Sequence, residues 1–176
     1  MGQYYKPMSI DKMEHVYSHD YGNGLKLMEH SYIGNNFVNT VESLLAPGGE
    51  WYKNRLVWAG DYADEEENGD NLWTQVGDDP IEPEDMEKVE SGRYIVNHTV
   101  REFVDKDIVP KDSQGWKVHP LPLLTCEGNG RGGGDYRLHN DAVGYWARDE
   151  ISIEKEEPKD FDEIIPHFIM DKKQKQ

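Results

Sequence analysis

The sequence predicts a strand-rich α+β domain with one main helix, and three observations lead to this fold class. Short runs of β-branched and aromatic residues recur along the chain, separated by Gly, Pro, Asn and Asp, which is typical of strands joined by turns. Apolar residues at helical spacing stand out only in residues 36–46. A length of 176 residues without internal repeats favours one domain, residues 1–176, that can bury a core.

The N-terminal third begins with two predicted strands. Residues 3–10 form the first, which contains Pro7 or ends at it, and residues 15–19 form the second. The DYGNG sequence at 20–24 predicts a tight turn, because Gly and Asn tolerate the left-handed backbone conformation. Residues 25–32 fit either a short strand or one to two helical turns.

The main helix is expected over residues 36–46. Starting at Phe37, apolar residues fall at i, i+4, i+7 and i+8, which places them on one helical face. Asn35 or Asn36 can cap its first turn. The Pro-Gly-Gly sequence at 47–49 ends it.

Further strands are predicted along the rest of the chain. Residues 55–59 read as a buried strand, residues 93–97 and 101–105 as a β-hairpin, and residues 144–153 as another strand. Residues 116–126 are apolar but contain two prolines, which predicts an edge strand or an extended segment.

The C-terminal tail predicts one more helix. Phe161, Ile164, Ile165 and Phe168 have helical spacing, interrupted at Pro166. Residues 172–176 are expected to be frayed.

Negative charge is concentrated in one window of the chain. The formal net charge is −16, and residues 61–90 contribute −12 of it through thirteen acids and one lysine. Such a window predicts a long acidic loop or insertion over residues 61–92, with a short helix near residues 83–89. Dense negative charge disfavours direct binding to nucleic acid or membranes and favours a basic protein surface. The candidate partner-binding residues are Asp61, Asp64, Glu65, Glu66, Glu67, Asp78, Asp79, Glu82, Glu84 and Asp85.

A glycine-rich segment is the second candidate site. Residues 125–136 read TCEGNGRGGGDY, and such a loop can turn several backbone N–H groups toward one anion. Gly130, Arg131, Gly132 and Gly133 are the candidate anion-binding residues, with Arg131 as a clamp for phosphate or carboxylate. The segment matches neither the P-loop nor the dinucleotide-binding pattern. A structural turn therefore stays open as the alternative.

Histidine and cysteine residues suggest a structural zinc site. His19, His30, His119 and Cys126 are the candidate ligands, and their spacing matches no local zinc signature, so they would have to converge from separate elements. The alternative is ordinary packed or exposed histidines. Cys126 paired with a histidine is also a conceivable nucleophile, although a single cysteine is more often a small buried apolar residue.

Cellular location is predicted from what the sequence lacks. Cys126 is the only cysteine, so no disulfide can form within the chain. There is no signal-peptide pattern and no apolar run of membrane-spanning length. These features predict a cytoplasmic protein, including the cytoplasm of an infected host cell.

Several patches of the sequence resemble a family of uncharacterised bacteriophage and prophage accessory proteins. The patches are MGQYYKP (1–7), YSHDYGNGLKLMEH (17–30), VWAGDYAD (57–64), RYIVNHT (93–99) and HPLPLLTCEGNGRGGGD (119–135). The resemblance implies a phage accessory gene and supplies no catalytic residues. Small acidic proteins of this kind often inhibit host defence, and some anti-CRISPR proteins mimic nucleic acid.

Two functions from different classes follow as hypotheses. The first is a stoichiometric inhibitor, anti-CRISPR-like, whose acidic face competes for the basic nucleic-acid channel of a host defence effector, with or without a structural zinc. The second is a nucleotide-binding or nucleotide-hydrolysing protein that uses the glycine-rich segment at residues 126–135. The first implies a host protein as partner, and the second a small-molecule nucleotide.

Overall fold

The computed structural model describes residues 3–83, 91–111, 114–128 and 142–165. Its first sheet has the strand order β2-β1-β3-β6. β1 (Tyr5–Ser9) is antiparallel to both β2 (Glu14–His15) and β3 (Leu56–Gly60), while β6 (Cys126–Glu127) runs parallel to β3. The strands predicted at residues 3–10 and 55–59 are therefore confirmed, with Pro7 inside β1.

The second sheet has the order β7-β4-β5-β8. β4 (Tyr94–Asn97) and β5 (Glu102–Asp105) form the predicted hairpin, and β7 (Ile151–Glu154) pairs with β4. β8 (Asp162–Glu163) runs parallel to β5 at the edge. Together with few helices, the two sheets confirm a strand-rich α+β fold.

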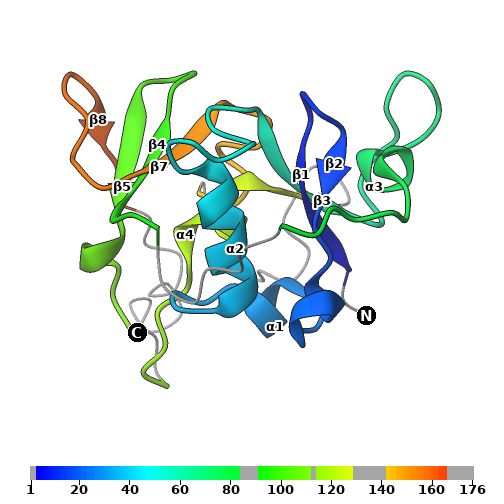
Figure 1. Cartoon of the computed structure of the whole chain (residues 1–176), viewed down its shortest axis with the longest axis horizontal. Coiled ribbons are helices and arrows are strands. Elements are labelled where there is room, and N and C mark those ends of the chain that lie inside the picture. The colour runs from blue at the N-terminus through cyan, green and yellow to red at the C-terminus, as the bar shows by residue number, and fades with distance from the viewer. Residues whose placement is uncertain (1–2, 84–90, 112–113, 129–141, 166–176) are drawn as a thin grey trace, which may run out of the picture.

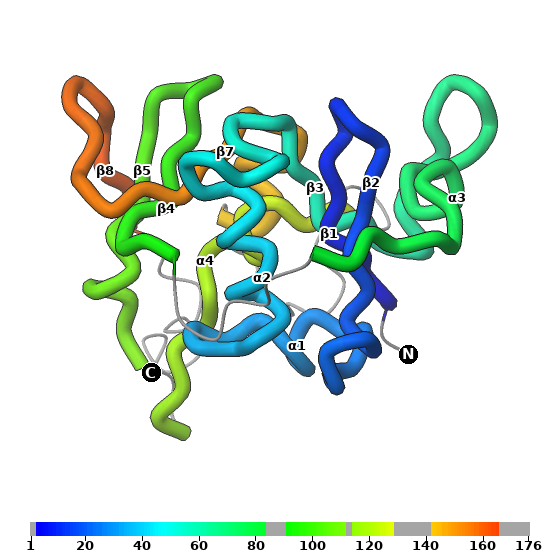
Figure 2. The backbone as a smooth tube through the Cα atoms, in the orientation of Figure 1, coloured from blue at the N-terminus to red at the C-terminus, as the bar shows by residue number. Residues whose placement is uncertain are grey.

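The main helix α2 (Asn36–Leu45) lies between the two sheets, as Figures 1 and 2 show. Asn35 caps it, because its side-chain oxygen accepts hydrogen bonds from the backbone N–H groups of Phe37 and Val38. Buried residues of α2, including Phe37, join Trp58 of the first sheet and Ile153 of the second in one core. The helix predicted from periodicity is thus confirmed, and it supplies the centre of the core.

Backbone hydrogen bonds join the two sheets where β3 and β7 begin. Leu56 N donates to Asp149 O at 3.0 Å, and Arg148 N donates to Leu56 O at 2.8 Å. Arg148 takes a left-handed conformation (φ 73°) at this junction. Turns occupy most of residues 142–149, so the predicted strand at 144–153 is wrong in its first half and correct from Ile151.

Residues 14–32 contain less strand than predicted. β2 is two residues long, and a 3₁₀ turn, η1 (Ser18–Tyr21), follows it, so a strand over residues 15–19 is wrong beyond His15. Of the two alternatives predicted at residues 25–32, a short strand or helical turns, the helical one is found: α1 (Leu27–His30) is one turn. Gly22 ends η1 with φ 77°, which explains the glycine in the predicted turn.

The extended segment predicted at residues 116–126 is wrong, because most of it forms helix α4 (Pro120–Thr125). Both prolines lie in the first turn, where backbone N–H groups have no partner within the helix. His119 caps this turn by accepting a hydrogen bond from Leu121 N. The proline pattern therefore marked a helix start.

The C-terminal helix is not formed over residues 161–165, where β8 and extended chain are found. Its remainder and the frayed end at 172–176 lie outside the described residues. A further helix, α3 (Leu72–Val76), and a 3₁₀ turn, η2 (Lys106–Ile108), were not predicted. Among the described residues no helix is long and apolar enough to cross a bilayer.

Candidate acidic interaction surface

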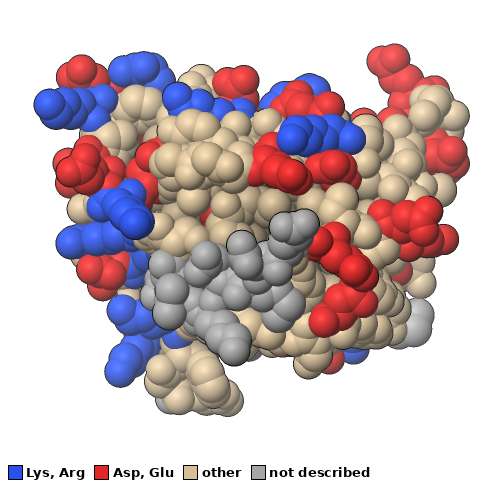
Figure 3. Space-filling view, in the orientation of Figure 1, with Lys and Arg blue, Asp and Glu red and all other residues tan. Residues whose placement is uncertain are grey.

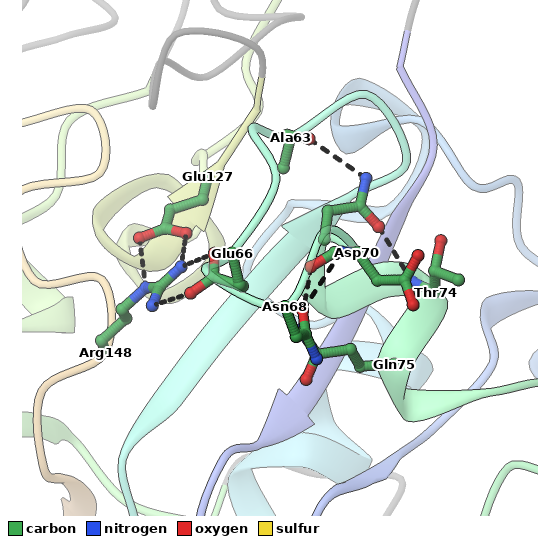
Figure 4. Close-up of polar contacts among 9 residues, drawn as sticks. Ala63, Glu66, Asn68, Asp70, Thr74, Gln75, Glu127 and Arg148 are labelled. Atoms are coloured by element: carbon green, nitrogen blue, oxygen red, sulfur yellow. Dashed lines mark hydrogen bonds and ion pairs between the residues drawn. The ribbon is translucent and has the colours of Figure 1, made fainter.

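The acidic segment is folded against the first sheet over residues 61–83. Helix α3 lies within it, and Asn71 caps this helix by accepting a hydrogen bond from Thr74 N at 3.0 Å. The Asn71 amide also donates to the carbonyl of Asp61 at 3.0 Å and to that of Ala63 at 3.1 Å, the second of which Figure 4 shows. The Asn71 side chain thus connects the residues that follow β3 to the first turn of α3.

Arg148 fixes the middle of the acidic segment (Figure 4). Its guanidinium donates two hydrogen bonds to Glu66, at 2.8 and 2.7 Å, and two to Glu127, both at 2.8 Å. Such bidentate pairs are strong and geometrically specific. The bonds to Glu66 and then to Glu127 raise the pKa of Arg148, so its charge is permanent. Glu66 is therefore an internal anchor of the segment.

Lys6 of β1 fixes the C-terminal end of α3. Its buried ammonium donates to Gly77 O at 2.7 Å and to Trp73 O at 3.2 Å, and it lies 4.1 Å from the centroid of the Trp73 ring. Asp78 Oδ1 lies 3.8 Å away. Burial lowers the pKa of Lys6, and the charge of Asp78 opposes this shift. A lysine at the end of a helix neutralises its terminal carbonyls.

Most of the predicted partner-binding carboxylates are exposed. Asp61 is an exception: it is partly buried and accepts a hydrogen bond from Tyr4 N at 3.0 Å. Acidic side chains gather over and around α3, on the right of Figure 3, whereas lysines and arginines are more frequent on the left. Glu84 and Asp85 lie outside the described residues. The exposed acids of the segment are Asp64, Glu65, Glu67, Asp70, Asp78, Asp79 and Glu82.

The zinc candidates have separate structural roles. His30 is fully buried, with Nδ1 3.0 Å from Gly24 O and Nε2 accepting a 3.0 Å hydrogen bond from Trp58 Nε1. Burial lowers the pKa of His30 to about 4, so the ring is neutral. His19 is exposed and packs edge-on against Tyr17.

His119 and Cys126 complete the zinc candidates, and both are buried. The two ring nitrogens of His119 contact Leu121 N and Glu42 Oε2, and Cys126 Sγ donates to Leu123 O at 3.3 Å. Within the described ranges, no group of three or more His, Cys, Asp or Glu side chains is arranged to hold a metal. A zinc site stays a prediction that the geometry does not favour.

A buried polar centre at Glu42 was not predicted from the sequence. Glu42 Oε2 lies 2.7 Å from Lys106 Nζ and 2.6 Å from His119 Nε2, and Oε1 accepts a 3.0 Å hydrogen bond from Ser91 N. Burial alone would raise the pKa of Glu42, but His119 and Lys106 hold it below its ordinary value. Charged residues buried this way give no sequence signal, because isolated acids and bases usually mark the surface.

The glycine-rich candidate site lies almost wholly outside the described residues, which end at residue 128 and resume at 142. Gly130, Arg131, Gly132 and Gly133 are therefore not placed. Glu127, just before the loop, binds Arg148 and so shares an anchor with the acidic segment. A comparison with known protein families, curated proteins and solved structures found no match to this chain.

Proposed function

We propose that this protein is a stoichiometric inhibitor whose acidic surface occupies the basic nucleic-acid channel of a defence effector. The observation that carries the proposal is that seven exposed carboxylates lie on an ordered segment. Lys6 of β1 binds the end of α3, Arg148 joins Glu66 to Glu127 of β6, and Asn71 closes the start of the segment on itself. Channels that hold nucleic acid are lined with Lys and Arg, and neutralisation of charge supplies much of their affinity. An array of carboxylates would compete with the phosphates of nucleic acid for the same Lys and Arg side chains.

Fixation of the segment matters for affinity. A loose acidic chain would lose conformational entropy when it binds, whereas a preformed surface has already lost it. Lys6, Asn71 and Arg148 supply this order. The phage accessory context suggested by the sequence patches fits a protein that acts by binding.

The experiment compares two variants of equal charge. One neutralises Asp78, Asp79, Glu82, Glu84 and Asp85 to their amides, and the control neutralises five acids near β8: Glu156, Glu157, Asp160, Asp162 and Glu163. Pull-downs from host lysate at low and high salt are followed by displacement of nucleic acid from the captured effector. We expect salt-sensitive capture and displacement by the wild type and the control, and loss of both in the first variant. Full inhibition by the first variant would contradict charge mimicry.

The nucleotide-binding hypothesis remains the alternative. Its site at residues 126–135 is described only at Cys126, Glu127 and the residue after them, so no contact supports it. Calorimetry against a panel of nucleotides tests it. Binding heat or turnover with any nucleotide would favour it over the inhibitor.

A further inference from the structure

Asn-Gly sequences occur three times in the chain, at residues 23–24, 68–69 and 129–130. In such a pair the backbone nitrogen of the glycine can attack the side-chain amide of the asparagine, because glycine has no Cβ to obstruct the approach. The first two pairs have opposite surroundings, and the third lies outside the described residues.

Asn23 is held by hydrogen bonds at both polar atoms of its amide. Its Nδ2 donates to Tyr21 O at 3.1 Å and to Asn36 Oδ1 at 2.8 Å. Its Oδ1 accepts from Asn35 Nδ2 at 2.8 Å. The amide cannot turn toward Gly24 unless these three bonds break, so the fold protects Asn23 from attack.

Asn68 lies exposed in the acidic segment, and its amide is bound at the oxygen. Oδ1 accepts from Asp70 N at 3.1 Å and from Gln75 Nε2 at 3.2 Å, and Figure 4 shows the three residues together. Within the described part of the chain, Asn68 Nδ2 has no hydrogen-bond partner. Two donors at the oxygen favour attack on this amide, because attack moves negative charge onto Oδ1.

Gly69 supplies the attacking nitrogen from a tight turn. Its N–H donates to Glu66 O at 2.9 Å, and Glu66 N donates to Asp70 O at 3.0 Å, so the turn must open before attack. Gly69 is exposed and has φ 94°, and a Cβ at this position would meet no atom within 4 Å. Exposed turns with few packing contacts open at low free-energy cost. The Asn68 amide is therefore much less protected than that of Asn23.

We propose that Asn68 is converted into a carboxylate without an enzyme, through a succinimide formed with Gly69. The Gly69 nitrogen gives up its proton through water and bonds to Asn68 Cγ. The Cγ–Nδ2 bond breaks, and Nδ2 leaves with that proton as ammonia. Water then opens the ring: hydrolysis at Cγ gives aspartate, and hydrolysis at the main-chain carbonyl gives isoaspartate. Water is the only co-reactant, and both products carry a carboxylate.

The new carboxylate joins the acidic surface described above. Glu67 and Asp70, both exposed, flank Asn68 closely in the sequence, so the reaction adds charge where acids are already dense. Under the proposed inhibitor function, affinity for a basic channel increases as the protein ages. This gain in affinity rests on the proposed function, whereas the reaction itself does not.

The test is incubation of the whole purified chain at neutral and at mildly alkaline pH, followed by proteolysis and mass spectrometry. We expect deamidation at Asn68 to be at least about tenfold faster than at Asn23, because the three hydrogen bonds of Asn23 must break first. The reaction at Asn68 should yield both aspartate and isoaspartate and should accelerate with pH, since the attacking nitrogen must lose its proton. In urea-unfolded protein the two rates should become similar. Asn68→Gln should remove the fast reaction and leave the rate at Asn23 unchanged.

Two outcomes would overturn the reaction: a rate at Asn23 in the folded protein equal to or above that at Asn68, and the absence of isoaspartate at residue 68. The gain in affinity is measured separately, by binding of Asn68→Asp and Asn68→Gln to poly-arginine at low salt. Tighter binding by Asn68→Asp is expected, and equal binding would overturn the gain. Because mass spectrometry follows the reaction without any partner, the modification can fail while the inhibitor proposal stands.

Discussion

Lys106 donates a 2.7 Å hydrogen bond to Glu42 in the interior, where the two side chains are 1% and 0% exposed. The pair joins η2 to the central helix α2, and His119 extends it to the start of α4. A buried pair of this kind gives little net stability relative to apolar residues, but it is costly to break because one charge is left without its partner.

Lys106→Met should therefore destabilise the protein by about 3–5 kcal/mol. The double variant Glu42→Gln with Lys106→Met should recover a large part of that loss, because no buried charge remains unpaired. Urea unfolding of the two variants measures both effects. A loss of about 1 kcal/mol or less for Lys106→Met would mean that water reaches the pair.

Buried neutral histidines predict a loss of stability in acid. Burial lowers the pKa of His30 to about 4, and burial together with Lys6 lowers that of His15 to about 4. Between pH 6.5 and 4 the unfolded chain binds protons that the folded chain does not, so the free energy of unfolding falls as pH falls through this window. The share of His30 is roughly 3 kcal/mol.

Urea unfolding at a series of pH values tests this expectation. His30→Gln should flatten the profile over the same window, while lowering stability at neutral pH because the buried ring that packs against Phe37 and Trp58 is lost. An unchanged slope in His30→Gln would show that His30 does not contribute, and that His15 or the carboxylates cause the acid loss.

Helical spacing of apolar residues predicted α2, and two β-rich runs predicted the hairpin of β4 and β5, in which every residue but Glu102 is buried. Helix α4 was not predicted, because Pro120 and Pro122 suggested an extended chain although a first helical turn accepts proline. Strand β8 was not predicted either, because a two-residue strand has no period.

The acidic surface could be predicted from the amino-acid composition of residues 61–90, but the contacts that hold it in place could not. Glu66 looks like its neighbours in the sequence, yet Arg148, 82 positions away, binds it. Lys6 and Glu42 likewise resemble surface charges in sequence and are buried. Partners distant in sequence are set by the sheet pairing, and a single sequence does not reveal that pairing.

Arg148→Lys should loosen the acidic segment, because an ammonium cannot make bidentate bonds to two carboxylates. We expect a loss of about 2 kcal/mol and faster amide hydrogen exchange around Glu66. Arg55→Lys is the matched control, since its ion pair with Asp11 is about half exposed and should contribute little. Equal effects of the two variants would contradict an anchoring role for Arg148.

Lys6→Met separates the order of the acidic surface from its charge. The substitution makes the protein more negative but removes the ammonium that binds Gly77 and Trp73 at the end of α3. If affinity comes from a fixed array of carboxylates, effector binding should weaken despite the added negative charge, and amides of residues 72–78 should exchange faster. Lys12→Met changes the net charge equally at an exposed site and should leave exchange unaltered. Stronger binding by both variants would show that charge alone drives the interaction, and that the folding of residues 61–83 onto the sheet serves stability instead.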